Sequence, residues 1–187
     1  MKILSCLKTI LNLFNTKNNK DNINTSSLST PQLIPNEFHN DEIINRFIYA
    51  PINIDSKKNS LKTNAFTPPF NSQELSVNRH NYSTVSEMKK IAKKGSNPES
   101  SRSFHGFGIL TVNQILSTTS QIIYTPILEP SNNRNIFHSD ILLGYTLIRG
   151  EEKPPELTKK IKDLTKSCKL FIDPNPESDE CDIQIDI

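Results

Sequence analysis

Two polar side chains interrupt apolar runs of this sequence in places where they could do chemistry. Arg46 stands inside the run 43–49, and a guanidinium there needs a carboxylate, a phosphate or several carbonyl groups to offset its desolvation. His138 stands just ahead of the run 141–148 and two residues before Asp140. In a strand these two side chains would share a face, and the carboxylate would fix the tautomer of a general base. Arg46 and His138 are therefore the candidate catalytic residues.

Both residues also have a purely structural interpretation, which the sequence favours. Buried arginines more often brace a fold than bind a substrate. The carboxylates that would pair with Arg46 in that case are Glu42, Glu74 and Asp140. His138 would then be an ordinary core or surface histidine whose ring nitrogens are hydrogen-bonded.

A second group of candidates precedes the helix that begins after Thr84. Arg79 and His80 lie in the loop before this helix, and free backbone amides at a helix N-terminus favour negative charge. Ser76 lacks the Gly-x-Ser-x-Gly setting of a nucleophile elbow, so its hydroxyl is expected to bond a neighbour. The candidate ligand-binding residues are Arg79, Ser76 and His80, with a solvated loop as the alternative.

A weaker candidate anion site follows along the chain, but Gly-x-Gly alone does not make a phosphate loop. Its residues are Arg102, His105, Gly106 and Gly108.

The sequence predicts neither a metal nor a cofactor. The four histidines do not fall at the spacings of a compact zinc or His/carboxylate site. The three cysteines, Cys6, Cys168 and Cys181, are odd in number and far apart, so they predict no disulfide framework and favour a reducing, cytoplasmic compartment.

Composition limits the partners. The net charge of +2, from 22 basic and 20 acidic side chains, lacks the basic bias of a nucleic-acid binder, so no nucleic acid is expected. Hydrophobic residues make up 34% of the chain, which predicts that part of it is unfolded. No apolar run approaches the roughly 20 residues of a membrane-spanning helix.

The pattern along the chain predicts five segments. Residues 1–14 form an amphipathic helix that packs on protein or, alternatively, makes a peripheral membrane contact. A flexible linker, rich in Asn, Ser and Thr, covers 15–38. A core domain covers 39–150, a C-terminal helix and strand cover 151–173, and an acidic, solvated tail covers 174–187.

Within the core, short strands outnumber helices. Strands are predicted at 43–49, 75–77, 107–112, 121–124, 141–148 and 169–172. Thr84 and Glu87 form a capping box for a helix that ends at Gly95. Pro154 and Pro155 open a second helix with Leu157, Ile161 and Leu164 on its buried face. The predicted fold is α+β, a single small mixed sheet with one or two packed helices between disordered segments.

Several short motifs in a fixed order resemble a family of small, functionally uncharacterised bacterial proteins. They are Arg46-Phe47-Ile48, Asn64-Ala65-Phe66 with Pro68, Leu75-Ser76-Val77, Gly108-Ile109-Leu110-Thr111-Val112, Pro126, and His138 with Ile141. The resemblance covers roughly 43–145. It supports the limits of the core domain and implies no activity.

Two functions remain open from the sequence. The first is a non-catalytic interaction domain with a protein partner, which explains the tails and the shortage of acid/base pairs. The second is a small effector or toxin-like enzyme acting on a nucleotide, in which Arg46 and Arg79 bind phosphate and His138 transfers a proton. A variant of the second is a distant relative of ADP-ribosyltransferases, although the catalytic glutamate of those enzymes has no clear candidate. Convergence of Arg46, Arg79 and His138 in one pocket would favour the enzyme.

Overall fold

The fold comes from a computed structural model that describes residues 33–55, 57–129, 133–180 and 185. All of these belong to one compact unit, Leu33–Ile187. The helix predicted at 1–14 and the linker up to residue 32 lie outside the described residues. In the described part, no helix is long and apolar enough to cross a membrane.

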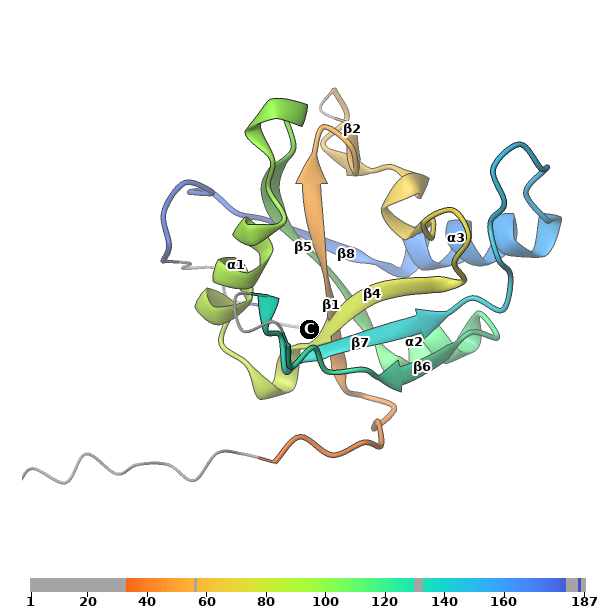
Figure 1. The fold of residues 1–187 in the computed structure, drawn as a ribbon, viewed down its shortest axis with the longest axis horizontal. Helices are drawn as coiled ribbons and strands as arrows, with labels where there is room; N and C mark the ends of the chain where they lie inside the picture. The colour runs from red at the N-terminus through yellow and green to blue at the C-terminus, as the bar shows by residue number, and fades with distance from the viewer. Residues whose placement is uncertain (1–32, 56, 130–132, 181–184, 186–187) are drawn as a thin grey trace, which may run out of the picture. The chain divides into compact units, whose positions relative to one another are not determined.

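A six-stranded sheet forms the centre of the unit, in the order β6-β7-β4-β1-β5-β8 (Figure 1). The strands are β1 (Ile43–Ala50), β4 (Glu74–Arg79), β5 (Ser103–Thr111), β6 (Gln121–Tyr124), β7 (His138–Leu142) and β8 (Lys169–Ile172). A separate two-stranded sheet pairs β2 (Ile54–Asp55) with β3 (Ser60–Leu61). The helices are α1 (Val85–Lys94), α2 (Val112–Ser117) and α3 (Pro155–Ser167), with short 3-10 turns at Thr63–Phe66, His80–Tyr82 and Pro98–Ser100.

The predicted α+β class is confirmed, with a difference in the sheet. All the strand pairings within the six-stranded sheet are antiparallel, whereas a mixed sheet was expected. The helix and strand of 151–173 pack into the same core as the rest, because β8 pairs with β5 and α3 buries Leu157, Ile161 and Leu164.

Each face of the sheet carries its own apolar cluster, since successive side chains of a strand point to opposite faces. Ile44 and Ile48 of β1 join the cluster that α2 and α3 cover. Tyr49 of β1 joins Phe104 and Phe107 of β5 in the cluster that α1 covers. The sheet is thus covered by helices on both faces.

Local sequence signals account for the helix ends. The capping box of Thr84 and Glu87 is confirmed, with the Thr84 side chain accepting from the Glu87 amide at 3.2 Å. Thr111 and Gln114 form a second capping box, which starts α2. Gly95 ends α1 as predicted, and a Cβ at this position would collide with the Tyr49 hydroxyl.

Three segments differ from the predicted elements. The strand predicted at 141–148 is β7, which starts earlier and ends at Leu142, because the chain leaves the sheet through Gly144 at a φ of +79°. Ile54–Asp55 and Ser60–Leu61, for which no strand was predicted, form the β2–β3 hairpin. The acidic tail is not wholly solvated: buried Lys89 of α1 pairs with Asp173 at 2.7 Å and donates to the Asn175 carbonyl.

One feature of the sheet determines where a site can form. β1 pairs with β5 through eight residue pairs, but with β4 through two, Ile44↔Arg79 and Asn45↔Asn78. Past these pairs the two strands diverge, as Figure 1 shows. Two three-stranded halves, β6-β7-β4 and β1-β5-β8, therefore meet at a short junction and separate beyond it.

Candidate functional site

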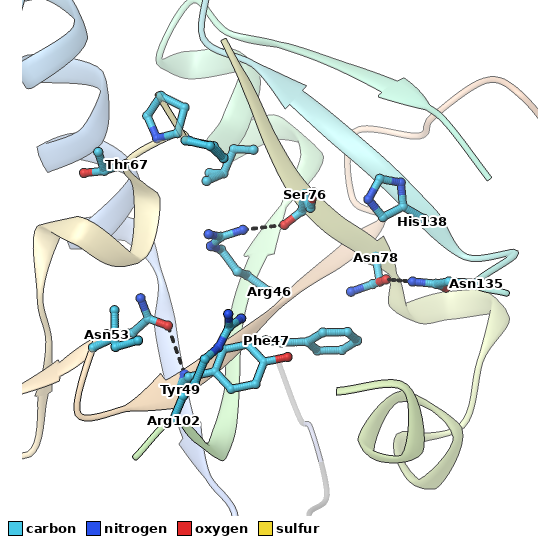
Figure 2. A pocket seen from close by; sticks show the side chains of 14 residues that line it. Arg46, Phe47, Tyr49, Asn53, Thr67, Ser76, Asn78, Arg102, Asn135 and His138 are labelled. Atoms are coloured by element: carbon cyan, nitrogen blue, oxygen red, sulfur yellow. Dashed lines mark hydrogen bonds between the residues drawn. The ribbon is translucent and has the colours of Figure 1, made fainter. Parts of the chain in front are cut away.

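A cavity of about 590 Å³ lies where β1 and β4 separate (Figure 2). Both strands contribute to its wall, together with the loops after β1 and before β4, the residues just ahead of β5, and the start of β7. The lining residues are Arg46, Phe47, Tyr49, Ile52, Asn53, Thr67, Pro68, Pro69, Leu75, Ser76, Asn78, Arg102, Asn135 and His138.

Arg46 bridges the opening between the two strands. Its Nε donates to the carbonyl of Ala65, and its Nη1 donates to the carbonyl of Ser76 on β4 at 2.5 Å (Figure 2). The guanidinium thus binds a carbonyl that a continuous sheet would pair with the backbone of β1. Among the described residues, Nη2 has no hydrogen-bond partner, so it remains available to a ligand.

The electrostatic setting of Arg46 differs from what the sequence predicted. An ion pair with Glu42, Glu74 or Asp140 was expected, but the described residues contain none with Arg46, and carbonyl groups take that place. Burial lowers the pKa of Arg46 to about 10. Tyr49 and Cys168 act in the opposite direction, and the positive charge of Arg102 makes a smaller contribution that lowers the pKa. Arg46 therefore stays charged at neutral pH.

Arg102 places a second guanidinium in the same cavity. Its side chain lies over the Tyr49 ring, with Cζ 4.1 Å from the ring centroid. The ring is itself held, because the Tyr49 hydroxyl donates to the carbonyl of Ala92 at 2.9 Å. The Arg102 Nε is buried and, in the described part of the chain, has no hydrogen-bond partner.

His138 is held in one tautomer by the chain next to it. Its Nδ1 lies 2.8 Å from the carbonyl oxygen of Thr125, which can only accept, so the proton of the neutral ring sits on Nδ1. The Thr125 hydroxyl donates to Asp140 Oδ2 at 2.7 Å, while His138 Nδ1 is 3.8 Å from that oxygen. The predicted pairing with Asp140 is thus mediated by Thr125. Nε2 keeps its lone pair and has no partner among the described residues.

A chain of amide side chains fixes the floor of the cavity. Asn78 donates to Asn45 at 3.3 Å and accepts from Asn135 at 2.7 Å. Asn53 accepts from the Tyr49 amide at 3.0 Å, so its Nδ2 remains as a donor. These bonds hold the polar wall rigid without adding any net charge.

The charges of the wall are one-sided. Arg46 and Arg102 contribute two permanent positive charges, and no aspartate or glutamate is present among the described residues that line the cavity. Buried or partly buried like charges raise the free energy of the folded state unless an anion neutralises them. The arrangement suits an anionic ligand.

The five candidate residues separate into two places. Arg46, Ser76 and His138 line the cavity together. Arg79 and His80 do not, so Arg46, Arg79 and His138 do not converge in this cavity.

Arg79 is completely buried against Glu42, with Nε and Nη2 donating to the two carboxylate oxygens at 2.5 and 2.6 Å. It also binds the carbonyls of Pro35 and Glu37 and lies over the Phe38 ring. These contacts use four of the five N–H groups of Arg79, which therefore braces the start of the domain. They also tie down residues that were expected to be linker.

His80 and the two glycines of the weaker candidate site, Gly106 and Gly108, also have structural roles. Burial lowers the pKa of His80, which lies in the turn before α1. Gly106 and Gly108 lie within β5, where a Cβ would collide with the Phe171 carbonyl of β8 or approach the Cys168 Sγ. Of the residues in that weaker candidate site, Arg102 lines the cavity, where it contacts Tyr49. No spacing in the sequence predicts this contact.

The described residues contain no group of three or more His, Cys, Asp or Glu side chains that could hold a metal ion. Comparisons with protein-family models, with curated proteins and with solved structures gave no match.

Proposed function

We propose that the protein is a non-catalytic binding domain that captures a phosphate-bearing ligand in the cavity between β1 and β4. The observation that carries this proposal is the presence of Arg46 and Arg102 in one cavity whose described lining has no acidic side chain. The protein partner expected from the sequence would present such a group or depend on its binding.

A phosphate group matches these donors better than a monatomic anion does. Each guanidinium is planar and offers parallel N–H groups that match two oxygens of a phosphate. Arg46 keeps Nη2 and Arg102 keeps Nε without a partner among the described residues. A bound anion would also offset the repulsion through which Arg102 lowers the pKa of Arg46.

The shortage of acid/base groups supports a binding role over a catalytic one. The described lining contains one histidine, His138, and no Asp, Glu, Cys or Lys that would complete an acid/base pair with it. The lack of a lining carboxylate likewise counts against an ADP-ribosyltransferase.

An enzyme acting on a nucleotide is the second candidate, and one observation favours it. The Thr125 carbonyl leaves His138 Nε2 unprotonated, which is the state of a general base. Incubation of the full chain with nucleotides, followed by separation of products, decides between the two candidates: turnover that His138→Asn abolishes would establish the enzyme and end the non-catalytic proposal.

The test of anion binding is thermal unfolding of the full chain in sodium pyrophosphate and in sodium chloride of equal ionic strength. A ligand at about 100 times its Kd adds about 2.7 kcal/mol to the free energy of unfolding, or roughly 5 to 10 °C in a domain of this size. Arg102→Gln should lose most of this shift and Arg46→Lys part of it. Exposed Arg149, which lies over Phe70 outside the cavity, supplies the matched control Arg149→Gln, with a wild-type shift. An equal shift in all four proteins would overturn the proposal.

A further inference from the structure

We propose that the ligand is a nucleotide, with its phosphates at Arg46 and Arg102 and a ribose hydroxyl donating to His138 Nε2. This inference rests on the proposed function and names its ligand class. Three properties of the cavity carry it: its size, its free acceptor and its apolar wall.

The cavity is much larger than a single phosphate requires. Its volume of about 590 Å³ lies within the roughly 300–1,000 Å³ of sites that take small organic ligands. The two guanidinium groups occupy the side formed by β1 and the residues ahead of β5, while His138 comes from β7. Figure 2 shows Arg46 and His138 on either side of strand β4. A ligand that meets all three must extend beyond its charged group.

His138 supplies an acceptor that the amide side chains of Asn53 and Asn78 do not. The side-chain oxygens of Asn53 and Asn78 already accept hydrogen bonds from Tyr49 and Asn135. His138 Nε2 is free among the described residues because the Thr125 carbonyl holds the proton on Nδ1. An unprotonated Nε2 can accept a hydrogen bond from a hydroxyl of the ligand. The Ser76 hydroxyl, on the neighbouring strand, can accept or donate beside it.

The remaining wall is apolar. Phe47, Ile52, Pro68 and Pro69 line the cavity, and Ile52 keeps 44% of its surface exposed, a large value for an isoleucine in a folded domain. The faces of a nucleobase are apolar and its edge carries acceptors, for which Asn53 Nδ2 is a free donor. A phosphate site, a hydroxyl acceptor and an apolar wall together match the three parts of a nucleotide.

Calorimetric titration of the full chain with ADP, inorganic pyrophosphate, ribose 5-phosphate and an ADP analogue without ribose hydroxyls tests each part. We expect ADP to bind at least about tenfold more tightly than pyrophosphate or ribose 5-phosphate, and the analogue to lose about tenfold, the size of one good hydrogen bond. The comparison of ADP with its analogue uses the wild-type protein, so it does not depend on any variant folding.

His138→Asn provides the matched variant, because the asparagine amide can still donate to the Thr125 carbonyl while the Nε2 acceptor is lost. In this variant, ADP and the analogue should bind equally, and pyrophosphate should bind as in the wild type. A variant that still prefers ADP over the analogue would overturn the role of His138. ADP that binds no more tightly than pyrophosphate or ribose 5-phosphate would overturn the nucleotide while leaving anion binding intact. Failure of both pyrophosphate and ADP to bind would overturn the proposed function itself.

Discussion

Arg46 and Arg102 place two guanidinium groups in one cavity, where no described lining side chain neutralises them. Burial lowers the pKa of Arg46 to about 10, so Arg46 stays charged at neutral pH. Arg102 adds a second guanidinium, and no carboxylate of the described lining pairs with either group. Arg79 differs, because Glu42 neutralises its charge. Arg79 therefore has a structural role, whereas Arg46 and Arg102 form a candidate binding site.

Replacing Arg46 should destabilise the protein as well as weaken anion binding. Arg46→Leu would leave the carbonyls of Ala65 and Ser76 without their donor, and the bridge between β1 and β4 would be lost. The expected loss in the free energy of unfolding is about 1–3 kcal/mol, less than for a fully buried group because the Ser76 contact is exposed to solvent. Urea unfolding measures it. Arg46→Lys, which can bind one carbonyl, should lose less, and equal losses for the two variants would contradict the bridging role.

Breaking the buried pair of Arg79 and Glu42 should destabilise the protein strongly, whereas replacing both residues with apolar ones should destabilise it much less. Glu42→Ala leaves a completely buried arginine charge, for which a loss of about 3–5 kcal/mol in the free energy of unfolding is expected. The double variant Arg79→Met/Glu42→Leu removes both charges and should recover much of that loss. Chemical denaturation of Arg79→Met, Glu42→Leu and the double variant gives the coupling between the two residues. Losses that simply add would show that the two side chains do not act as a pair.

Local signals in the sequence predicted the elements but not the connection between them. The capping box at Thr84 and the prolines before α3 depend on neighbours along the chain, so they could be identified. The early separation of β1 from β4 depends on register between distant segments, which no local pattern encodes.

The candidate site shows the same limit. Arg46 and His138 stood out because each interrupts or precedes an apolar run, and both line the cavity. Arg79 was expected in the loop before α1, but it is the last residue of β4 and its charge is paired with Glu42. Residue type alone could show neither this pair nor the packing of Arg102 over Tyr49, because both contacts join segments that are distant in the sequence.

The stability of the protein should decline as the pH falls through the ordinary range of histidine. Burial lowers the pKa of His80 and of His105 from the ordinary value of 6.5, so the folded state favours neutral rings. The unfolded chain binds more protons below that pH, and the free energy of unfolding therefore decreases as the pH drops through it. Their stabilising contribution is complete above pH 6.5 and is lost as the pH falls through the lowered folded-state pKa values.

Urea midpoints measured between about pH 7 and about pH 5 check this dependence. The double variant His80→Asn/His105→Asn should show a shallower decline than the wild type. His39→Asn, at an exposed position, is the control and should leave the slope unchanged. A double variant with the slope of the wild type would assign the decline to other groups.

The thiol of Cys168 should resist alkylation in the folded protein. Burial raises its pKa to about 12, against smaller opposing effects from a hydrogen bond with the backbone at Ile109 and from the charge of Arg46. Only the thiolate reacts, and at about pH 8 its fraction is on the order of one in ten thousand, far below that of an ordinary cysteine. Iodoacetamide labelling followed by mass spectrometry of the peptide that contains Cys168 should give much slower modification in buffer than in urea. Because the charge of Arg46 lowers this pKa, Arg46→Leu should slow the folded-state reaction further, provided that labelling is compared at equal folded fractions. Equal labelling rates for wild-type Cys168 in buffer and in urea would contradict the buried environment that β5 and α3 build around it.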